Sequence, residues 1–157
     1  MLTNKKSKKQ IHPLEKLRFS GLHGETFAIF LRISNNLGKI HYNLFKKFGL
    51  TEAQFFTLMS VYCSQDKKLT FSEISKILMV SRANVTSVIQ RLEERKLVKR
   101  LADDSDRRLV YACLTREGNR LLESIHPDYV SWISSIFTDF SSQEMKVFYQ
   151  FLRRLQL

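Results

Sequence analysis

One segment of the sequence carries a row of polar side chains at helical spacing. Between about Arg82 and Lys96, apolar residues recur at intervals of three and four, which predicts a helix with one inward face. The inward positions are Val85, Val88, Ile89 and Leu92. The opposite face then carries Arg82, Ala83, Thr86, Ser87, Gln90, Arg91 and Glu94, with Asn84 on its flank.

The chemistry available to this face is contact with bases and phosphates. Gln90 could pair with adenine through two hydrogen bonds, and the small Ala83 would permit close approach or contact with a thymine methyl group. Arg82 and Arg91 could reach either a phosphate or a guanine. A solvated surface could have the same composition, so the choice depends on the elements around this helix.

The neighbouring elements favour the recognition of DNA. A short amphipathic helix at 71–78 and a tight connection at 79–81 precede the polar helix, and Ser81 is a suitable N-cap. Two short strands follow at 97–101 and 109–114, with the alternation expected of a half-buried hairpin. This order predicts a helix-turn-helix with a β-hairpin wing, a shape that places a helix in the major groove.

The tip of the predicted wing holds three carboxylates beside two guanidinium groups. Its sequence is Asp103-Asp104-Ser105-Asp106-Arg107-Arg108. An arginine at such a tip matches the negative potential of a narrow minor groove, and Asp106 could hold Arg108 in place through a charge-assisted hydrogen bond. The alternative is an exposed loop whose charges neutralise one another.

The remaining periodicity predicts further helices at about 25–48, about 52–64, from about 116 onward and from about 142 to 154. Pro127 should kink or divide the third of these, and Ser141 with Glu144 forms a capping box for the last. Leu69–Thr70 could add a one-bridge strand. The fold class is therefore mainly α with a small β-hairpin wing.

The first helix and the last two carry more apolar surface than one core of this size readily hides, which predicts a twofold homodimer. We expect a basic tail at 1–18, either frayed or adding phosphate contacts, and one domain at 19–157. Within this domain, 19–50 and 116–157 would form dimerisation helices, and 51–115 the DNA-binding lobe.

The composition narrows the class of partner. The chain has 26 basic and 15 acidic side chains among 157 residues, a net charge of +11, which favours encounter with polyanions. Double-stranded DNA is the leading partner and an anionic membrane surface the second. No apolar run approaches the roughly 20 residues that span a bilayer, and no signal peptide is present. We expect a soluble cytoplasmic protein without a membrane role.

Enzymatic and metal chemistry find little support in the sequence. No nucleophile elbow is present, and with only five glycines no phosphate-cradling loop appears. The four histidines (His12, His23, His41 and His126) lack ligand spacing, so no metal or cofactor is expected. Cys63 and Cys113 form no CxxC pair and are expected to be small, semi-buried hydrophobic residues.

Three segments of the sequence resemble the MarR family of bacterial winged-helix regulators. They are GLTEAQFFTL from Gly49, VSRANVTSVIQRLEERKLVKR with the helix before it, and DDSDRRLVYACLT running into REGNRLL. The resemblance covers about residues 25–155. It implies a triangular homodimer on a pseudo-palindromic operator, with Arg82–Arg91 as the major-groove helix and Asp106 with Arg108 as the wing pair.

The resemblance also implies a mode of control, because members are usually repressors released by a small phenolic or anionic ligand, by cysteine oxidation, or occasionally by metal. Ligand sites of the family lie where the dimerisation helices meet the winged lobe. The corresponding residues here are His41, Tyr42, Phe45, Phe55, Met59, Tyr62 and Cys63. Each could equally be ordinary core. Cys63 lies outside the N-terminal stretch that usually holds the peroxide-sensing cysteine of the family.

Three positions depart from the family pattern. Lys96 stands where a glycine commonly ends the recognition helix, so a left-handed backbone there would be strained. Ser87 and Gln90 replace a common arginine and a common acidic residue, so the operator sequence cannot be transferred from relatives. The leading hypothesis is a sequence-specific regulator. The alternatives are a winged-helix module that binds a protein and a protein that coats DNA without reading its sequence.

Overall fold

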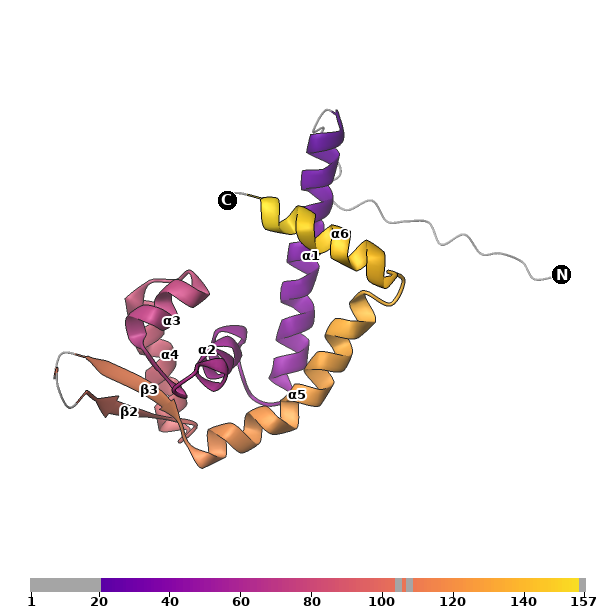
Figure 1. Ribbon diagram of the computed structural model, residues 1–157. Helices are drawn as coiled ribbons and strands as arrows, with labels where there is room; N and C mark the ends of the chain where they lie inside the picture. The colour runs from indigo at the N-terminus through magenta and orange to yellow at the C-terminus, as the bar shows by residue number, and fades with distance from the viewer. Residues whose placement is uncertain (1–20, 104–105, 107–108, 156–157) are drawn as a thin grey trace. The chain divides into compact units, whose positions relative to one another are not determined.

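The computed structural model describes residues 21–103, 106 and 109–155, and these are mostly helical (Figure 1). Contacts divide the chain into two units, Met1–Glu52 and Ala53–Leu157, and each is described by itself. The predicted basic tail at 1–18 lies outside the described residues. Within the described part, no helix combines the length and apolarity needed to cross a membrane.

The first unit is built on α1 (Gly21–Lys46), which begins about four residues earlier and ends about two residues earlier than predicted. Gly49 follows this helix in the left-handed conformation, with φ +64°, as is common after a helix end. Phe48 and Leu50 both donate backbone hydrogen bonds of 3.0 Å to the carbonyl of Phe45. Phe27, Ile29, Phe30, Ile33 and Ile40 leave an apolar face of α1 exposed.

The second unit contains the remaining elements. In chain order they are α2 (Glu52–Cys63, beginning at the boundary between the units), β1 (Lys68–Thr70), α3 (Phe71–Leu78), α4 (Arg82–Glu94), β2 (Val98–Ala102), β3 (Val110–Leu114), α5 (Arg116–Ile136) and α6 (Ser142–Arg154). The mainly helical fold with a small wing is confirmed. The bounds of α3 are those predicted, whereas α4 ends two residues early.

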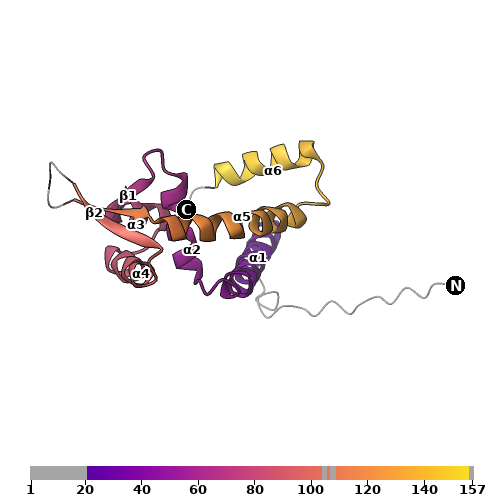
Figure 2. The same ribbon diagram turned by 90° about the horizontal axis from the view of Figure 1, so that it is seen from below.

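The three strands form one antiparallel sheet in the order β1-β3-β2. Leu69 pairs with Ala112, and Arg100 pairs with Ala112 from the other side. β1 has three residues rather than a single bridge, so β3 is the central strand. Figure 2 shows β2 and β3 extending away from the helices and β3 leading directly into α5.

The core of the second unit gathers side chains from the helices and the sheet. Its buried members include Phe55, Leu58, Val61, Ile74, Val85, Ile89, Leu92, Val98, Ala112, Leu122 and Ile125. The wing itself contributes little to this core. On β2 only Val98 is buried, and Leu101 is 46% exposed. The expected half-buried alternation is therefore wrong for this strand, because the wing extends beyond the helices that could cover it.

α5 remains one helix although Pro127 lies inside it. A proline removes one backbone donor and crowds the preceding turn, so a bend is expected there. Figure 1 shows α5 changing direction along its length without a break. Thr115 caps this helix by accepting a hydrogen bond of 3.1 Å from the N–H of Gly118.

Candidate nucleic-acid interface

The connection between α3 and α4 is fixed by local hydrogen bonds. Met79 has a left-handed backbone, φ +51°, and its N–H reaches the carbonyls of Lys76 and Ser75. The hydroxyl of Ser75 donates to the carbonyl of Val80. Ser81 then caps α4, because its Oγ accepts a hydrogen bond of 3.2 Å from the N–H of Asn84. This chain of bonds sets the direction in which α4 leaves the turn.

The start of α3 is held by a complete capping box. The N–H of Thr70 donates to Oε2 of Glu73 at 2.7 Å, and the N–H of Glu73 donates back to Oγ1 of Thr70 at 3.2 Å. Hydrogen bonds from the Thr70 hydroxyl and backbone hold the pKa of Glu73 below its usual value. The two helices of the motif are therefore both capped at their first turn.

α4 buries its apolar side and exposes its polar side. Val85, Ile89 and Leu92 are at most 1% exposed, and Val88 is half-buried, which confirms the predicted inward face. The eight outward positions are all exposed: Arg82, Ala83, Asn84, Thr86, Ser87, Gln90, Arg91 and Glu94. The structure thus presents together, on one side of one helix, seven side chains expected to contact DNA.

Two of these side chains already make hydrogen bonds along the helix. The Thr86 hydroxyl donates to the carbonyl of Arg82 at 2.9 Å, so its oxygen lone pairs face outward as acceptors. Gln90 donates one amide N–H to Oε1 of Glu94 at 3.2 Å. The Gln90 amide keeps its carbonyl oxygen and its second N–H for a base. Glu94 therefore orients the group that the sequence assigned to adenine.

The wing tip is only partly described. The N–H of Asp106 donates to Oδ1 of Asp103 at 3.0 Å, and the N–H of Leu109 donates to the carbonyl of Asp106 at 2.8 Å. Arg107 and Arg108 lie outside the described residues, so the Asp106–Arg108 pair stays a prediction. The Asp103 carboxylate therefore holds the backbone of Asp106, a role that sequence reasoning did not assign to it.

The end of α4 shows the departure expected at Lys96, whose φ is +59°. A residue with a Cβ is strained in this left-handed conformation, so Lys96 has the backbone strain that was predicted for a lysine in place of the usual glycine. The carbonyl of Lys96 nevertheless accepts a hydrogen bond of 2.6 Å from the Thr115 hydroxyl. This bond ties the end of the recognition helix to the start of α5.

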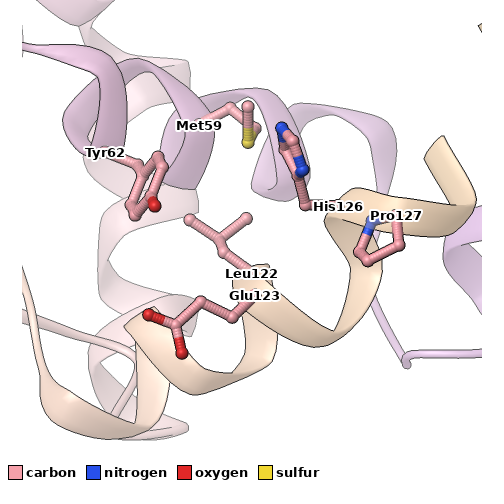
Figure 3. Close-up of a pocket in the computed structure, with 6 residues that line it drawn as sticks. All are labelled: Met59, Tyr62, Leu122, Glu123, His126 and Pro127. Atoms are coloured by element: carbon pink, nitrogen blue, oxygen red, sulfur yellow. The ribbon is translucent and has the colours of Figure 1, made fainter. Parts of the chain in front are cut away.

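A hollow of about 140 Å³ separates α2 from α5 (Figure 3). Met59 and Tyr62 of α2 line it, and both are among the residues that the sequence analysis proposed for a ligand site. The other lining residues come from α5, and sequence reasoning missed them because they lie some sixty residues away along the chain: Leu122, Glu123, His126 and Pro127. In Figure 3 the side chains of Leu122 and His126 point towards Met59 and Tyr62.

The other candidate ligand residues are placed differently. Phe55 is buried, and its ring centroid lies 4.9 Å from that of Tyr129, so it belongs to the core. Cys63 is exposed and does not line the hollow, which corrects the expectation that it is semi-buried, whereas Cys113 is buried. His41, Tyr42 and Phe45 lie on α1 in the first unit, where Nδ1 of His41 is 2.7 Å from Oε1 of Glu52. Across the described ranges, no cluster of three or more His, Cys, Asp or Glu side chains could hold a metal ion.

Comparison with known proteins shows that the chain is similar to bacterial transcriptional regulators in both sequence and fold. The chain is 28% identical over 154 residues to the transcriptional repressor YetL of Bacillus subtilis, covering 91% of this chain and 92% of YetL. It is 30% identical over 118 residues to the uncharacterised regulator YkoM of the same organism, covering 75% of each chain. The S. aureus MepR–DNA complex matches with a TM-score of 0.75 at 25% identity, over 80% of this chain and 92% of MepR.

The sequence pattern of the MarR family matches residues 50–110, the segment that runs from the start of α2 to the first residue of β3. That segment contains both helices of the motif, their caps and the outward face of α4. With its winged helix-turn-helix and its relatives among regulators and repressors, the chain belongs to the MarR family of DNA-binding transcriptional regulators, which are not enzymes.

Proposed function

We propose that the chain is a repressor that binds a pseudo-palindromic operator as a homodimer and is released by a small ligand. One observation carries the DNA-reading part of this proposal: α4 is capped, packed on its apolar side and exposed on its polar side. Side chains of the base-reading and phosphate-binding types occupy the exposed side. We assign them to the operator, together with Asp106, Arg107 and Arg108 of the wing.

Footprinting on DNA upstream of the gene tests this assignment. A dimer should protect one site with two half-sites about one helical turn, ~34 Å, apart. The matched competitor is a random duplex of the same length at physiological salt. Equal affinity for both duplexes would refute sequence-specific recognition and favour a protein that coats DNA through charge alone.

The homodimer is supported by apolar faces on both units. On α6, Phe148 is 37% and Phe151 is 58% exposed, and no residue of this helix is buried within the described range. Val147 and Leu152 are exposed beside them, and α1 carries its own exposed apolar face. Patches of this kind on soluble chains usually mark an interface. We therefore assign 19–50 and 116–157 to dimerisation and 51–115 to DNA binding.

The oligomeric state can be tested directly. Phe151→Asp places a charge in the proposed interface, and light scattering after size-exclusion chromatography should show a shift from dimer to monomer. Tyr149→Asp is the matched control, because Tyr149 is exposed on the same helix but outside the hollow that Phe151 lines with Phe148. A wild-type protein that elutes as a monomer would contradict the proposed assembly.

The hollow between α2 and α5 is the proposed ligand site. Met59, Leu122 and Pro127 give it apolar walls, and Tyr62, Glu123 and His126 supply polar groups that could orient a small molecule. Release is tested by titrating small aromatic compounds against the operator complex. Met59→Trp should fill the hollow and abolish any response to them while leaving operator binding in place. A response that survives this substitution would place the ligand elsewhere.

A protein partner is the second candidate. The exposed face of α4 is polar, but Ile77 and Met79 beside the turn are exposed apolar side chains of the kind that bind proteins. A tight partner in pull-downs, together with weak and salt-sensitive binding to any DNA, would favour this reading.

As a regulator of transcription, the protein would act in the cytoplasm.

A further inference from the structure

A second hollow lies at the foot of the wing, beside the first turn of α4. Its volume is about 160 Å³. It is lined by residues from three segments of the second unit: Thr70, Phe71 and Ser72 at the start of α3, Arg82 at the start of α4, and Arg100, Leu109 and Val110 of the wing. Two arginines from different elements, Arg82 of α4 and Arg100 of β2, therefore line one hollow.

Arg100 is held in this position on two sides. Its Nε lies 3.0 Å from Oε2 of Glu93 on α4. Its guanidinium carbon lies 5.5 Å from the centroid of the Phe71 ring, a cation–π distance. The ion pair uses the Nε edge, so the two terminal nitrogens of the guanidinium group retain their donors. A long side chain that is held in this way loses less conformational entropy when it binds a ligand.

The rest of the lining suits a phosphodiester. Within the described residues the guanidinium group of Arg82 makes no hydrogen bond or ion pair, so its fork of donors is available. The hydroxyl of Ser72 is a third donor, while Thr70 is already engaged by Glu73. Leu109, Val110 and the ring of Phe71 form apolar walls, against which a sugar can lie. Arginines bind phosphate through two parallel hydrogen bonds, which adds geometric specificity to the charge.

We propose that this hollow binds one phosphate of the DNA backbone, with Arg100 as a prepositioned donor and Arg82 as the second arm of the clamp. The inference rests on the proposed function, because a helix that enters the major groove at its N-terminal half brings the phosphates along the groove to this hollow. Sequence reasoning did not find Arg100, since its partners Glu93 and Phe71 come from other elements. The contact fixes the register of α4 on the duplex and carries no sequence information.

The test compares Arg100→Ala with Lys99→Ala. Both variants remove one positive charge from β2, but neighbouring residues of a strand point to opposite faces, so only Arg100 faces the hollow. Each phosphate contact contributes about 0.9 to the slope of log affinity against log salt concentration. Arg100→Ala should therefore lower the slope by about 0.9 per protomer. When the salt concentration falls from 1 M to 0.1 M, the variant should then gain about eightfold less affinity per protomer than the wild-type protein gains.

Lys99→Ala should change the slope by less than half as much. The loss for Arg100→Ala should be the same on operator and on random duplex, because the contact ignores sequence. This separates the two proposals: a wild-type protein without preference for an operator refutes the repressor, whereas equal slopes for the two variants refute the clamp.

A neutral methylphosphonate placed at each backbone position of one half-site in turn locates the contact. One position should cost wild-type protein about eightfold, and the same position should cost Arg100→Ala nothing further. Identical profiles for the two proteins would overturn the proposal. If thermal melting shows that Arg100→Ala is poorly folded, Arg100→Gln replaces it, because an amide retains a hydrogen bond to Glu93 without the charge.

Discussion

Gly118, in the first turn of α5, is predicted to be irreplaceable although it lies in a helix. A Cβ at this position would lie 2.1 Å from the carbonyl oxygen and 3.0 Å from the carbonyl carbon of Leu97. Ordinary carbon–oxygen contacts lie near 3.3 Å or more, so the backbone of α5 would have to move away by about 1 Å. The same carbonyl accepts a 3.1 Å hydrogen bond from the N–H of Thr115.

The magnitude of this effect follows from the contacts at stake. Overpacking typically costs about 1–3 kcal/mol. Moving α5 also weakens two hydrogen bonds, from Thr115 to Leu97 and to Lys96, each contributing about 1 kcal/mol. The better helix propensity of alanine returns at most about 1 kcal/mol. We therefore expect Gly118→Ala to lower the free energy of unfolding by about 2–4 kcal/mol.

Urea unfolding followed by circular dichroism measures this change at fixed protein concentration. Gly38→Ala is the matched control, because Gly38 is also helical and a Cβ there would meet nothing within 4 Å. This control should raise stability by up to about 1 kcal/mol. The reasoning is refuted if Gly118→Ala is as stable as the wild-type protein, or if both substitutions stabilise it.

Three further predictions concern strain, pH and recognition. Lys96→Gly should stabilise the protein by about 1–2 kcal/mol, because glycine adopts the left-handed conformation at φ +59° without penalty; an unchanged urea midpoint would contradict this. Hydrogen bonds from Ser141 hold the pKa of Glu144 below the usual 4.5, so its capping contribution is present at neutral pH and is lost as the pH falls through the lowered value. Glu144→Gln should therefore lose stability less steeply on acidification below pH 4.5, and parallel melting curves against pH for the two proteins would disprove it. Gln90→Ala should reduce the preference for operator over random duplex by about 1–3 kcal/mol while leaving the salt slope unaltered; a changed slope with unchanged preference would instead make Gln90 a phosphate contact.

Local signals predicted the helices and their first turns well. The N-caps in the structure are Ser81, Thr115 and Ser141. Each hydroxyl accepts a hydrogen bond from the free N–H three residues later, so the signal for the cap lies within four residues of sequence. The outward face of α4 followed from the spacing of Val85 and its partners for the same reason. Periodicity of this kind does not depend on the rest of the chain.

The features that sequence missed depend on packing between distant segments. Arg100 is an ordinary basic residue of a short strand until Glu93 and Phe71 are brought to it. The hollow beside Met59 exists only because α2 lies against α5, which supplies His126. These contacts cannot be predicted from the pattern of charge or hydrophobicity along the chain, because they join residues that are distant in sequence.

Thr115 alone separates β3 from α5, and its hydroxyl and N–H are both bonded to the end of the α4 region. Because this junction is one residue long and hydrogen-bonded, we expect a rotation of α5 to be transmitted to β3 rather than absorbed by a hinge. The β2–β3 hairpin and α5 should then turn together as one rigid body about Thr115. Inserting one residue at this junction should leave the hairpin and α5 folded and yet uncouple the motion of the hairpin from that of α5.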